Sequence, residues 1–406
     1  MRRIPRKLSI TDLDVAEKRV LMRVDFNVPL SGIKVADDSR IEAALRSIEF
    51  TVERGGRLVL ASHLGRPHAK RREDLSLAPV AKQLAARLGR PVDLAPSCIG
   101  RAVEKAVSKL EPGQVLLLEN LRFHSGEVDN DVEFARGLAS LADLYVNDAF
   151  GTAHRAHAST VGVPNVMGGG AAGLLMGKEL KYLYGVLNDP ETPVVTILGG
   201  AKVSDKIGIL QSLLPLTSTF LIGGGMAYTF LRAEGIGCGE SLVEEDKVGV
   251  ARELLAQARQ AGVEVLLPVD HVVGSSLGPD VQVEHCPMRS VPDQKMALDI
   301  GPRTIERFKQ VIENSRTIIW NGPMGVFEIS SCALGTVDIA RAVAGADATS
   351  IVAGGDSAAA VRLAGVSDSI THVSTGGGAS LTLLSGEPLP GVEALTERKE
   401  EQHSES

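Results

Sequence analysis

Residues 193–208, with the sequence PVVTILGGAKVSDKIG, constrain the fold more than any other stretch of the chain. The β-branched run 194–197 shows no polar–apolar alternation, which predicts a strand in a sheet covered on both faces. The pair Gly199 and Gly200 allows a sharp turn and a close approach of backbone to a ligand. If a helix follows, Lys202 and Lys206 share one face near its positive end, where a bound phosphate relieves their repulsion. An ordinary strand-to-helix turn with two solvated lysines fits this stretch equally well.

Similar glycine-rich turns recur through the second half of the chain. They are FLIGGGM (220–226), IIWNGPMG (318–325), IVAGGD (351–356) and THVSTGGG (371–378). In an open parallel sheet, ligands bind at the carboxyl ends of the strands, and helix N-termini there offer N–H groups to phosphate. The repetition favours a parallel sheet that binds a phosphate or a nucleotide.

In the first half, arginines follow predicted strands. Arg66, Arg122 and Arg155 come after the strands 57–61, 114–118 and 143–146, and Arg23 and Arg40 flank the tip of the strand 19–24. The planar guanidinium pairs with carboxylate and phosphate oxygens in a bidentate manner. Each of these residues alone fits an ordinary surface arginine. As a set at the carboxyl ends of parallel strands, they predict a crevice for a small polyanion.

Length and charge indicate two domains. A chain of 406 residues exceeds one ordinary core and is typical of two domains of roughly 200 residues each. Residues 1–185 hold 27 Lys and Arg against 22 Asp and Glu, a net charge of +5, whereas residues 186–406 hold 16 against 28, a net charge of −12. No dense basic stripe with interleaved aromatic residues appears, so a small anionic ligand is favoured over nucleic acid.

The sequence lacks the patterns that mark membrane-spanning or secreted proteins, disulfide frameworks, and the common nucleotide-binding motifs. No apolar run approaches the ~20 residues that span a bilayer, and the basic start lacks the apolar core of a signal peptide, so we expect a cytoplasmic protein without membrane contact. The four cysteines are scattered and form no C-x-x-C pair, which predicts reduced thiols. Neither the Walker motif nor the protein-kinase motifs H-R-D and D-F-G occur, so a nucleotide must be held by another arrangement.

Along nearly its whole length the sequence closely resembles the phosphoglycerate kinase family. The matching stretches are RVDFNVP (23–29), SHLGRP (62–67), NLRFH (120–124), VNDAFGTAHRAH (146–157), LGGAKVSDK (198–206), IGGGMAYTF (222–230), WNGPMGVFE (320–328), GGDSAAAV (354–361) and STGGGASL (374–381). Long matches in the same order along one chain make this resemblance highly specific.

The resemblance implies an α/β fold of two Rossmann-like domains, each a parallel sheet flanked by helices, joined by a hinge helix. The expected parts are a glycerate-substrate domain (1–177, to which 391–406 returns), a connecting helix (178–189) and a nucleotide-binding domain (190–390). The implied reaction is the reversible transfer of a phosphoryl group from 1,3-bisphosphoglycerate to Mg-ADP, giving 3-phosphoglycerate and ATP, by direct in-line transfer after the domains close. Mg²⁺ is the implied cofactor, and we expect a monomer.

Matching positions carry the family's site residues onto this chain. The expected substrate-binding residues are Arg23, Asp25, Phe26, Asn27, Arg40, His63, Leu64, Gly65, Arg66, Arg122 and Arg155. The expected nucleotide-binding residues are Gly199, Gly200, Lys202, Lys206, Gly223, Gly224, Ala297, Asn321, Pro323, Glu328, Gly354, Gly355, Asp356 and Ser357. Arg40, Lys202 and Gly377 are the expected catalytic groups, and Asp356 is the expected metal ligand.

Some positions depart from the family pattern or allow another interpretation. Ala297 and Ala353 stand where many members have glycine, and the stretch SGIKVADDSRI (31–41) replaces a DGK-like turn, so the position of Arg40 rests on DDSRI. Asp356 at the start of a predicted helix fits a helix cap as well as a metal ligand. A catalytically silent relative is a further hypothesis, but such a protein has no need of Arg40, Lys202 and Asp356 together. Another acyl-phosphate kinase is disfavoured by the arginine set of the first half.

Overall fold

The computed structural model describes residues 6–398, so the first five residues and the polar tail from residue 399 lie outside the described part. The chain separates into two compact units. The first unit contains the described residues up to Lys181 and those from Pro388 onward, and the second is Tyr182–Glu387. Helix α7 (Leu174–Asn188) runs through the boundary and also contains the boundary expected at residue 177. Within residues 6–398, no helix is long and apolar enough to cross a membrane.

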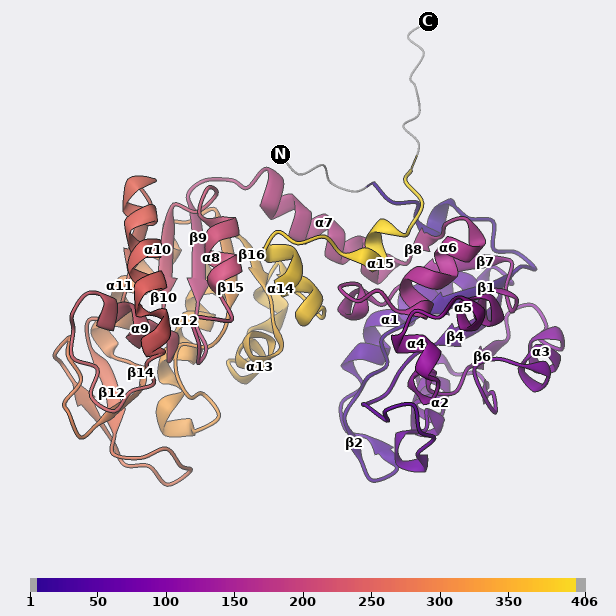
Figure 1. Ribbon diagram of the computed structural model, residues 1–406, viewed down its shortest axis with the longest axis horizontal. Helices are drawn as coiled ribbons and strands as arrows, with labels where there is room; N and C mark the ends of the chain where they lie inside the picture. The colour runs from indigo at the N-terminus through magenta and orange to yellow at the C-terminus, as the bar shows by residue number, and fades with distance from the viewer. Residues whose placement is uncertain (1–5, 399–406) are drawn as a thin grey trace, which may run out of the picture. The chain divides into compact units, whose positions relative to one another are not determined.

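A six-stranded parallel sheet forms the centre of the first unit, in the order β5-β6-β4-β1-β7-β8 (Figure 1). The strands are β1 (Arg19–Arg23), β4 (Arg57–Ala61), β5 (Val92–Leu94), β6 (Val115–Leu117), β7 (Leu144–Asn147) and β8 (Ala171–Ala172), and a small hairpin is formed by β2 (Leu30–Ser31) and β3 (Lys34–Val35). The helices, besides the first part of α7, are α1 (Ser39–Glu53), α2 (Ala78–Leu88), α3 (Arg101–Ser108), α4 (Ser125–Val128), α5 (Val132–Ala139), α6 (Val163–Met167) and α15 (Pro390–Glu393).

Helices cover both faces of this sheet, as the unbroken apolar strands require. Val20 and Met22 of β1 pack in one core cluster with Ile48 of α1 and Leu84 of α2. Connections between parallel strands are right-handed, and the strand order reverses direction after β5, so α3, α5 and α6 lie on the opposite face. All six strands therefore end at one edge, where the loops carrying the arginines gather.

A second six-stranded parallel sheet forms the centre of the other unit, in the order β11-β10-β9-β15-β16-β17. Its strands are β9 (Val194–Leu198), β10 (Thr219–Ile222), β11 (Glu264–Leu266), β15 (Thr317–Asn321), β16 (Thr349–Val352) and β17 (His372–Val373). Its helices are α8 (Ile207–Leu213), α9 (Met226–Ala233), α10 (Val248–Gln260), α11 (Pro302–Glu313), α12 (Leu334–Gly345), α13 (Gly355–Leu363) and α14 (Gly378–Leu384).

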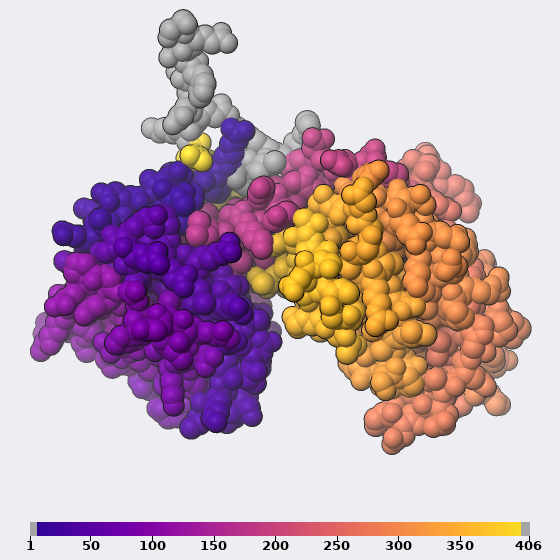
Figure 2. Space-filling model, turned by 180° about the vertical axis from the view of Figure 1, so that it is seen from behind, coloured from indigo at the N-terminus to yellow at the C-terminus, as the bar shows by residue number. Residues whose placement is uncertain are grey.

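The core of the second unit lies between its sheet and α11, α12 and α13. Trp320 of β15 is fully buried there with Phe308 of α11, Ile339 of α12 and Val361 of α13. On the face drawn in Figure 2, the orange and yellow segments that run from α11 to α14 form most of the visible surface of this unit. The predicted fold class, two parallel sheets flanked by helices, is confirmed.

Two features of the second unit differ from the sequence-based expectation. An antiparallel sheet of β12 (His271–Gly274), β13 (Val283–Cys286) and β14 (Met296–Ile300) is inserted between β11 and α11, and it was not predicted. The expected helix carrying Lys202 and Lys206 is wrong, because α8 begins only at Ile207. The lysines instead lie on a turn, and the side chain of Ser204 in that turn bonds to the carboxylate of Glu244.

Candidate functional site

Arg23 lies at the end of β1 and is almost completely buried. Its Nε donates to Ser159 Oγ at 2.8 Å, and one Nη lies 3.1 Å from His63 Nδ1. Burial, followed by the charges of Arg23 and Arg122, holds the pKa of His63 well below its usual value. His63 is therefore neutral, and its Nδ1 accepts from Arg23. Arg23 and His63 therefore form a buried, bonded pair at the end of β1 and the start of the loop after β4.

The neighbouring loops are tied together by hydrogen bonds from backbone N–H groups to asparagine side chains. Gly65 N–H donates to Asn27 Oδ1 at 2.9 Å, and Leu64 N–H donates to Asn120 Oδ1 at 3.1 Å. Phe26 and Leu64 are buried in the core cluster of this unit, so these two predicted residues shape the loops and do not line the cavity. Asn120, which the sequence analysis did not select, holds the loop after β4.

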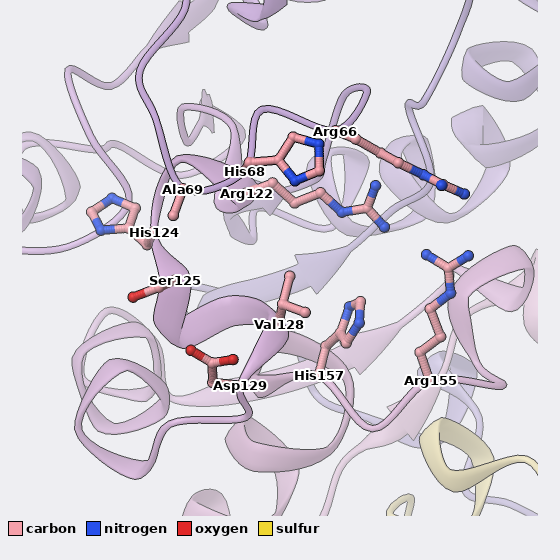
Figure 3. Close-up of a pocket in the computed structure, with 10 residues that line it drawn as sticks. All are labelled: Arg66, His68, Ala69, Arg122, His124, Ser125, Val128, Asp129, Arg155 and His157. Atoms are coloured by element: carbon pink, nitrogen blue, oxygen red, sulfur yellow. The ribbon is translucent and has the colours of Figure 1, made fainter.

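A cavity of about 330 Å³ opens at these loops. Figure 3 shows the guanidinium groups of Arg66, Arg122 and Arg155 pointing toward one space, with the imidazole of His157 beside it. The lining residues are Arg66, His68, Ala69, Arg122, His124, Ser125, Val128, Asp129, Arg155 and His157. The structure thus brings together the three arginines that sequence reasoning placed after three different strands.

The charges in this cavity are crowded. Burial first, and then Arg155 and Arg23, lower the pKa of Arg122 to about 10. Burial and the same kind of neighbouring arginines lower the pKa of His157 to about 4. The positive charges in this cluster repel one another, so an anion bound among the guanidinium groups lowers their electrostatic free energy. The arrangement can bind a compact polyanion.

Arg40 and Asp25 lie apart from the lining of this cavity. Arg40 is in the first turn of α1, as the sequence predicted, and its Nη1 donates to Asp25 Oδ2 at 2.9 Å. The guanidinium is half-buried, so part of it remains available to a ligand.

Two buried residues behind the arginines were missed by sequence reasoning. Ser159 Oγ donates to Glu127 Oε1 at 2.7 Å and Ser159 N–H donates to Glu127 Oε2 at 3.0 Å. Glu127 has no exposed surface, so it supplies a buried negative charge beneath the cationic cluster and fixes the hydroxyl that accepts from Arg23. Glu127 is one of several acidic residues in the segment 127–133, and nothing in the sequence selects it from the others.

The second unit has a cavity of about 310 Å³ at the carboxyl ends of its strands. It is lined by Gly200, Ala201, Gly224, Gly225, Tyr228, Leu242, Leu277, Met296, Ala297, Leu298, Asp299, Pro323, Met324, Gly325, Val326, Glu328 and Asp356. Six predicted residues are among them: Gly200, Gly224, Ala297, Pro323, Glu328 and Asp356. The lining combines glycines and apolar side chains with the carboxyl groups of Asp299, Glu328 and Asp356, which suits a flat, partly apolar ligand with a polar end.

Gly199 and Gly223 were predicted to bind a ligand, but they do not line this cavity. A Cβ on Gly199 would lie 2.0 Å from the carbonyl oxygen of Pro323, and one on Gly223 would lie 2.5 Å from the sulfur of Met324. These glycines let the loops after β9, β10 and β15 approach one another closely. Their role is to shape the cavity.

Lys206 and Asn321 form a polar group beside this cavity. Lys206 Nζ donates to Asn321 Oδ1, and Asn321 Nδ2 donates to the carbonyl of Ala353 at 2.5 Å. Gly322 N–H donates to Ser357 Oγ at 2.7 Å, so Ser357 holds the turn after β15. Burial lowers the pKa of Lys206. Lys202, by contrast, is exposed on its turn.

The remaining predicted residues lie at helix starts. Gly354 immediately precedes α13 with φ of 97°, and the exposed Gly355 and Asp356 form the first turn of that helix. Gly377 immediately precedes α14. Within residues 6–398, no group of three or more His, Cys, Asp or Glu side chains is placed to hold a metal ion.

Asp299 was missed by the sequence analysis. It lines the cavity from β14, and burial raises its pKa to about 7 although its carboxylate accepts N–H bonds from Gly335 and Ile300. The possible signal was a single carboxylate in the apolar strand MALDI, whose place in the fold depended on the unpredicted antiparallel sheet.

A family model and several known proteins match this chain along nearly its whole length. The model of one protein family, phosphoglycerate kinase, matches residues 10–387. This chain belongs to the phosphoglycerate kinase family. It is 55% identical over 392 residues to the phosphoglycerate kinase of Moorella thermoacetica, covering 97% of this chain and all of that protein. The phosphoglycerate kinase of Synechococcus elongatus is 51% identical over 391 residues, covering 95% of this chain and 97% of that protein.

Solved structures of phosphoglycerate kinases have the same fold. The structure of the enzyme from Coxiella burnetii is 39% identical and has a TM-score of 0.87, covering 96% of this chain and 98% of that one. The crystal structure from Pyrococcus horikoshii OT3 is 32% identical and has a TM-score of 0.80 over the same shares. The chain is therefore a kinase of this family, and a catalytically silent relative is the weaker hypothesis.

Proposed function

We propose that the two substrates of this phosphotransferase bind to different units of the chain. The reaction is the reversible transfer of a phosphoryl group from 1,3-bisphosphoglycerate to ADP, giving 3-phosphoglycerate and ATP. The observation that supports a glycerate site on the first unit is the cavity onto which Arg66, Arg122 and Arg155 converge. Three guanidinium groups match the phosphate and carboxylate oxygens of a phosphoglycerate.

The other residues of the first unit hold this site in shape or complete it. Arg23 and neutral His63 form a buried, bonded pair that does not line the cavity, and Asn27 holds the backbone of Gly65. The Arg40–Asp25 pair lies beside the loops, and 36% of the Arg40 side chain is exposed. We assign Arg40 to the end of the glycerate that gives or receives the phosphoryl group. The N–H groups of Arg40 that do not bond to Asp25 can donate to an oxygen of the ligand there without breaking the bond to Asp25.

On the second unit, the apolar wall of Leu298, Val326 and Ala297 suits the adenine base. Glu328 is placed to accept ribose hydroxyls, and the turn of Gly354, Gly355 and Ser357 offers backbone groups to the nucleotide. Lys206, already bonded to Asn321, and the exposed Lys202 provide the positive charge for the phosphates.

Asp356 fits Mg²⁺ as a single carboxylate. Mg²⁺ in nucleotide sites takes one or two carboxylates together with substrate phosphates, and the exposed Asp356 lines the nucleotide cavity. Bound there, the ion neutralises phosphate charge. Asp356→Asn should raise the Mg²⁺ concentration needed for half-maximal turnover while the protein stays folded. An unchanged Mg²⁺ dependence would refute the assignment, and loss of folding would support a plain helix cap instead.

Transfer itself needs no protein nucleophile or general base, because the attacking oxygen of ADP or of the glycerate carboxylate is already ionised. The transition state spreads charge over the equatorial oxygens, so positioning and charge stabilisation carry the catalysis. Arg40, Lys202 and the backbone N–H at Gly377 are the donors that we assign to it. Since the donors belong to both units, we propose that the units close during the reaction. Small-angle scattering tests this closure. A radius of gyration that does not change when both substrates are added together would contradict it.

We also propose that the protein acts as a monomer in the cytoplasm. Its four cysteines are free and buried, which suits a reducing compartment. Sedimentation velocity at micromolar concentration tests the monomer, and a concentration-dependent heavier species would contradict it.

A further inference from the structure

The turn that carries Lys202 and Lys206 precedes α8, and of the two lysines only Lys206, the N-cap residue, is bonded to the backbone of that helix. Ser204 stands midway between the two lysines. Its N–H donates to Glu244 Oε2 at 3.0 Å and its Oγ donates to Glu244 Oε1 at 2.6 Å. One carboxylate therefore takes both donors of the central residue of the turn, while the neighbouring Val203 is fully buried.

Glu244 is itself held in place. It belongs to the loop 237–244 between α9 and α10, and its N–H donates to Oγ1 of the buried Thr229 in α9 at 3.1 Å. Burial tends to raise the pKa of Glu244, but the bonds from Ser204 and Val203 outweigh burial and hold the pKa below its usual value. The carboxylate is thus ionised at neutral pH and makes charge-assisted bonds.

The same loop also contacts the nucleotide cavity. Ser241 Oγ accepts from the backbone N–H of Ala297 at 3.0 Å, and Leu242 lines the cavity directly. A single loop therefore joins the wall assigned to the base and the turn assigned to the phosphates. A carboxylate at this place repels nucleotide phosphates at long range, so its presence needs a local reason, and the two bonds to Ser204 supply one.

We propose that Glu244 is a positioning residue that holds the lysine turn in the geometry needed for the nucleotide phosphates. Fixing Ser204 limits the positions of Lys202 and Lys206, each two residues away, and lowers the entropy that must be lost when phosphate binds. This inference rests on the proposed role of the two lysines.

The proposal predicts a selective loss of phosphate binding. Glu244→Ala should weaken ADP and inorganic pyrophosphate by the same factor, roughly tenfold for loss of charge-assisted bonds, and leave adenosine unchanged. Ser204→Ala should act in the same direction, and the double variant should bind ADP no more weakly than Glu244→Ala. Glu244→Gln keeps one acceptor oxygen and should fall between wild type and Glu244→Ala.

Calorimetric titration of the intact protein with ADP, pyrophosphate and adenosine measures these effects. Glu245→Ala is the matched control, because Glu245 pairs on the surface with Arg232 at 3.4 Å. One outcome would contradict the role of Glu244 alone: Glu244→Ala binds ADP and pyrophosphate as tightly as wild type, while Lys202→Ala and Lys206→Ala bind them more weakly. The assignment of the two lysines to the phosphates would then still hold. Unchanged affinities in both lysine variants would overturn the lysine assignment and this inference with it. A loss of adenosine binding in Glu244→Ala would show collapse of the loop and also contradict the proposal.

Discussion

The two cavities occupy the same place in their units, at the carboxyl ends of parallel strands, but they are built differently. Three arginines converge on the first, whereas the second combines glycine turns, an apolar wall and a polar group around Lys206. A phosphoglycerate offers little except charge, so its site must supply charge. A nucleotide also offers a flat base, so much of its site can be backbone and apolar surface.

The pKa values follow the same difference. In the first unit, burial and neighbouring arginines lower the pKa values of His63, His157 and Arg122. In the second unit, burial raises the pKa of Asp299 to about 7. The lining of the first site carries excess positive charge, whereas the lining of the second includes a buried carboxyl group, Asp299.

The largest expected effect tests whether both cavities serve one reaction. Arg40→Ala on the first unit and Lys202→Ala on the second should each lower kcat roughly 100-fold or more, the scale for removing one donor that stabilises developing charge. The affinities for the substrates should change far less. Steady-state assays with Mg-ATP and 3-phosphoglycerate measure this, with Arg46→Ala, an exposed arginine of the same helix as Arg40, as control. Near-normal kcat in either variant would remove that residue from the catalytic set.

The next effect tests the assignment of the glycerate to the cluster of arginines. Arg66→Ala or Arg122→Ala should weaken 3-phosphoglycerate binding by ~1.5–3 kcal/mol, the usual value of a bond to a charged group, while ADP affinity stays the same. Calorimetric titration with each ligand separates the two outcomes. Arg71→Ala, at an exposed arginine after β4, is the matched control. Loss of ADP binding with intact glycerate binding would reverse the assignment of the units.

A smaller expected effect compares the interiors of the two units. Each unit holds a buried carboxyl group, Asp148 in the first and Asp299 in the second, and burial raises the pKa of each to about 7. In the unfolded chain these groups have the ordinary value of 3.8. Each carboxyl group therefore stays protonated to a higher pH in the folded state than in the unfolded chain. Its contribution to the free energy of unfolding is fully present below about pH 4 and is lost as the pH rises to about 7.

Asp148→Asn and Asp299→Asn stay neutral, so each should flatten the fall in the free energy of unfolding between pH 4 and 7. The slope removed is up to about 1.4 kcal/mol per pH unit for each site. Denaturant unfolding at several pH values measures it, with the exposed Asp93→Asn as control. A slope equal to that of wild type would mean that the carboxyl is ionised in the folded state.

The arginine cavity could be predicted because each of its arginines lies on the connection that follows a strand. Parallel strands bring their carboxyl ends to one edge, so sequence order alone places Arg66, Arg122 and Arg155 together. The residues beneath them could not be predicted in the same way. Glu127 reaches Ser159 across 32 positions of sequence, and no local pattern encodes that contact.

The cavity of the second unit was predicted less completely. Its glycine turns were recognised, but the antiparallel strands β12–β14 that carry Met296, Leu298 and Asp299 were not. The lysine turn was mistaken for a helix, because spacing of four residues indicates a helical face only if the backbone is helical. The side chain of Ser204 in this turn bonds to Glu244, forty positions away, and sequence spacing does not reveal such a contact.

The central claim is that the glycerate binds to the first unit and the nucleotide to the second. A crystal structure with 3-phosphoglycerate and Mg-ADP both bound tests it most directly. The account predicts the phosphate of the glycerate against Arg66, Arg122 and Arg155, and the base of ADP against Ala297 and Leu298. A glycerate bound among the glycine turns of the second unit, or a nucleotide base in the arginine cavity, would contradict it.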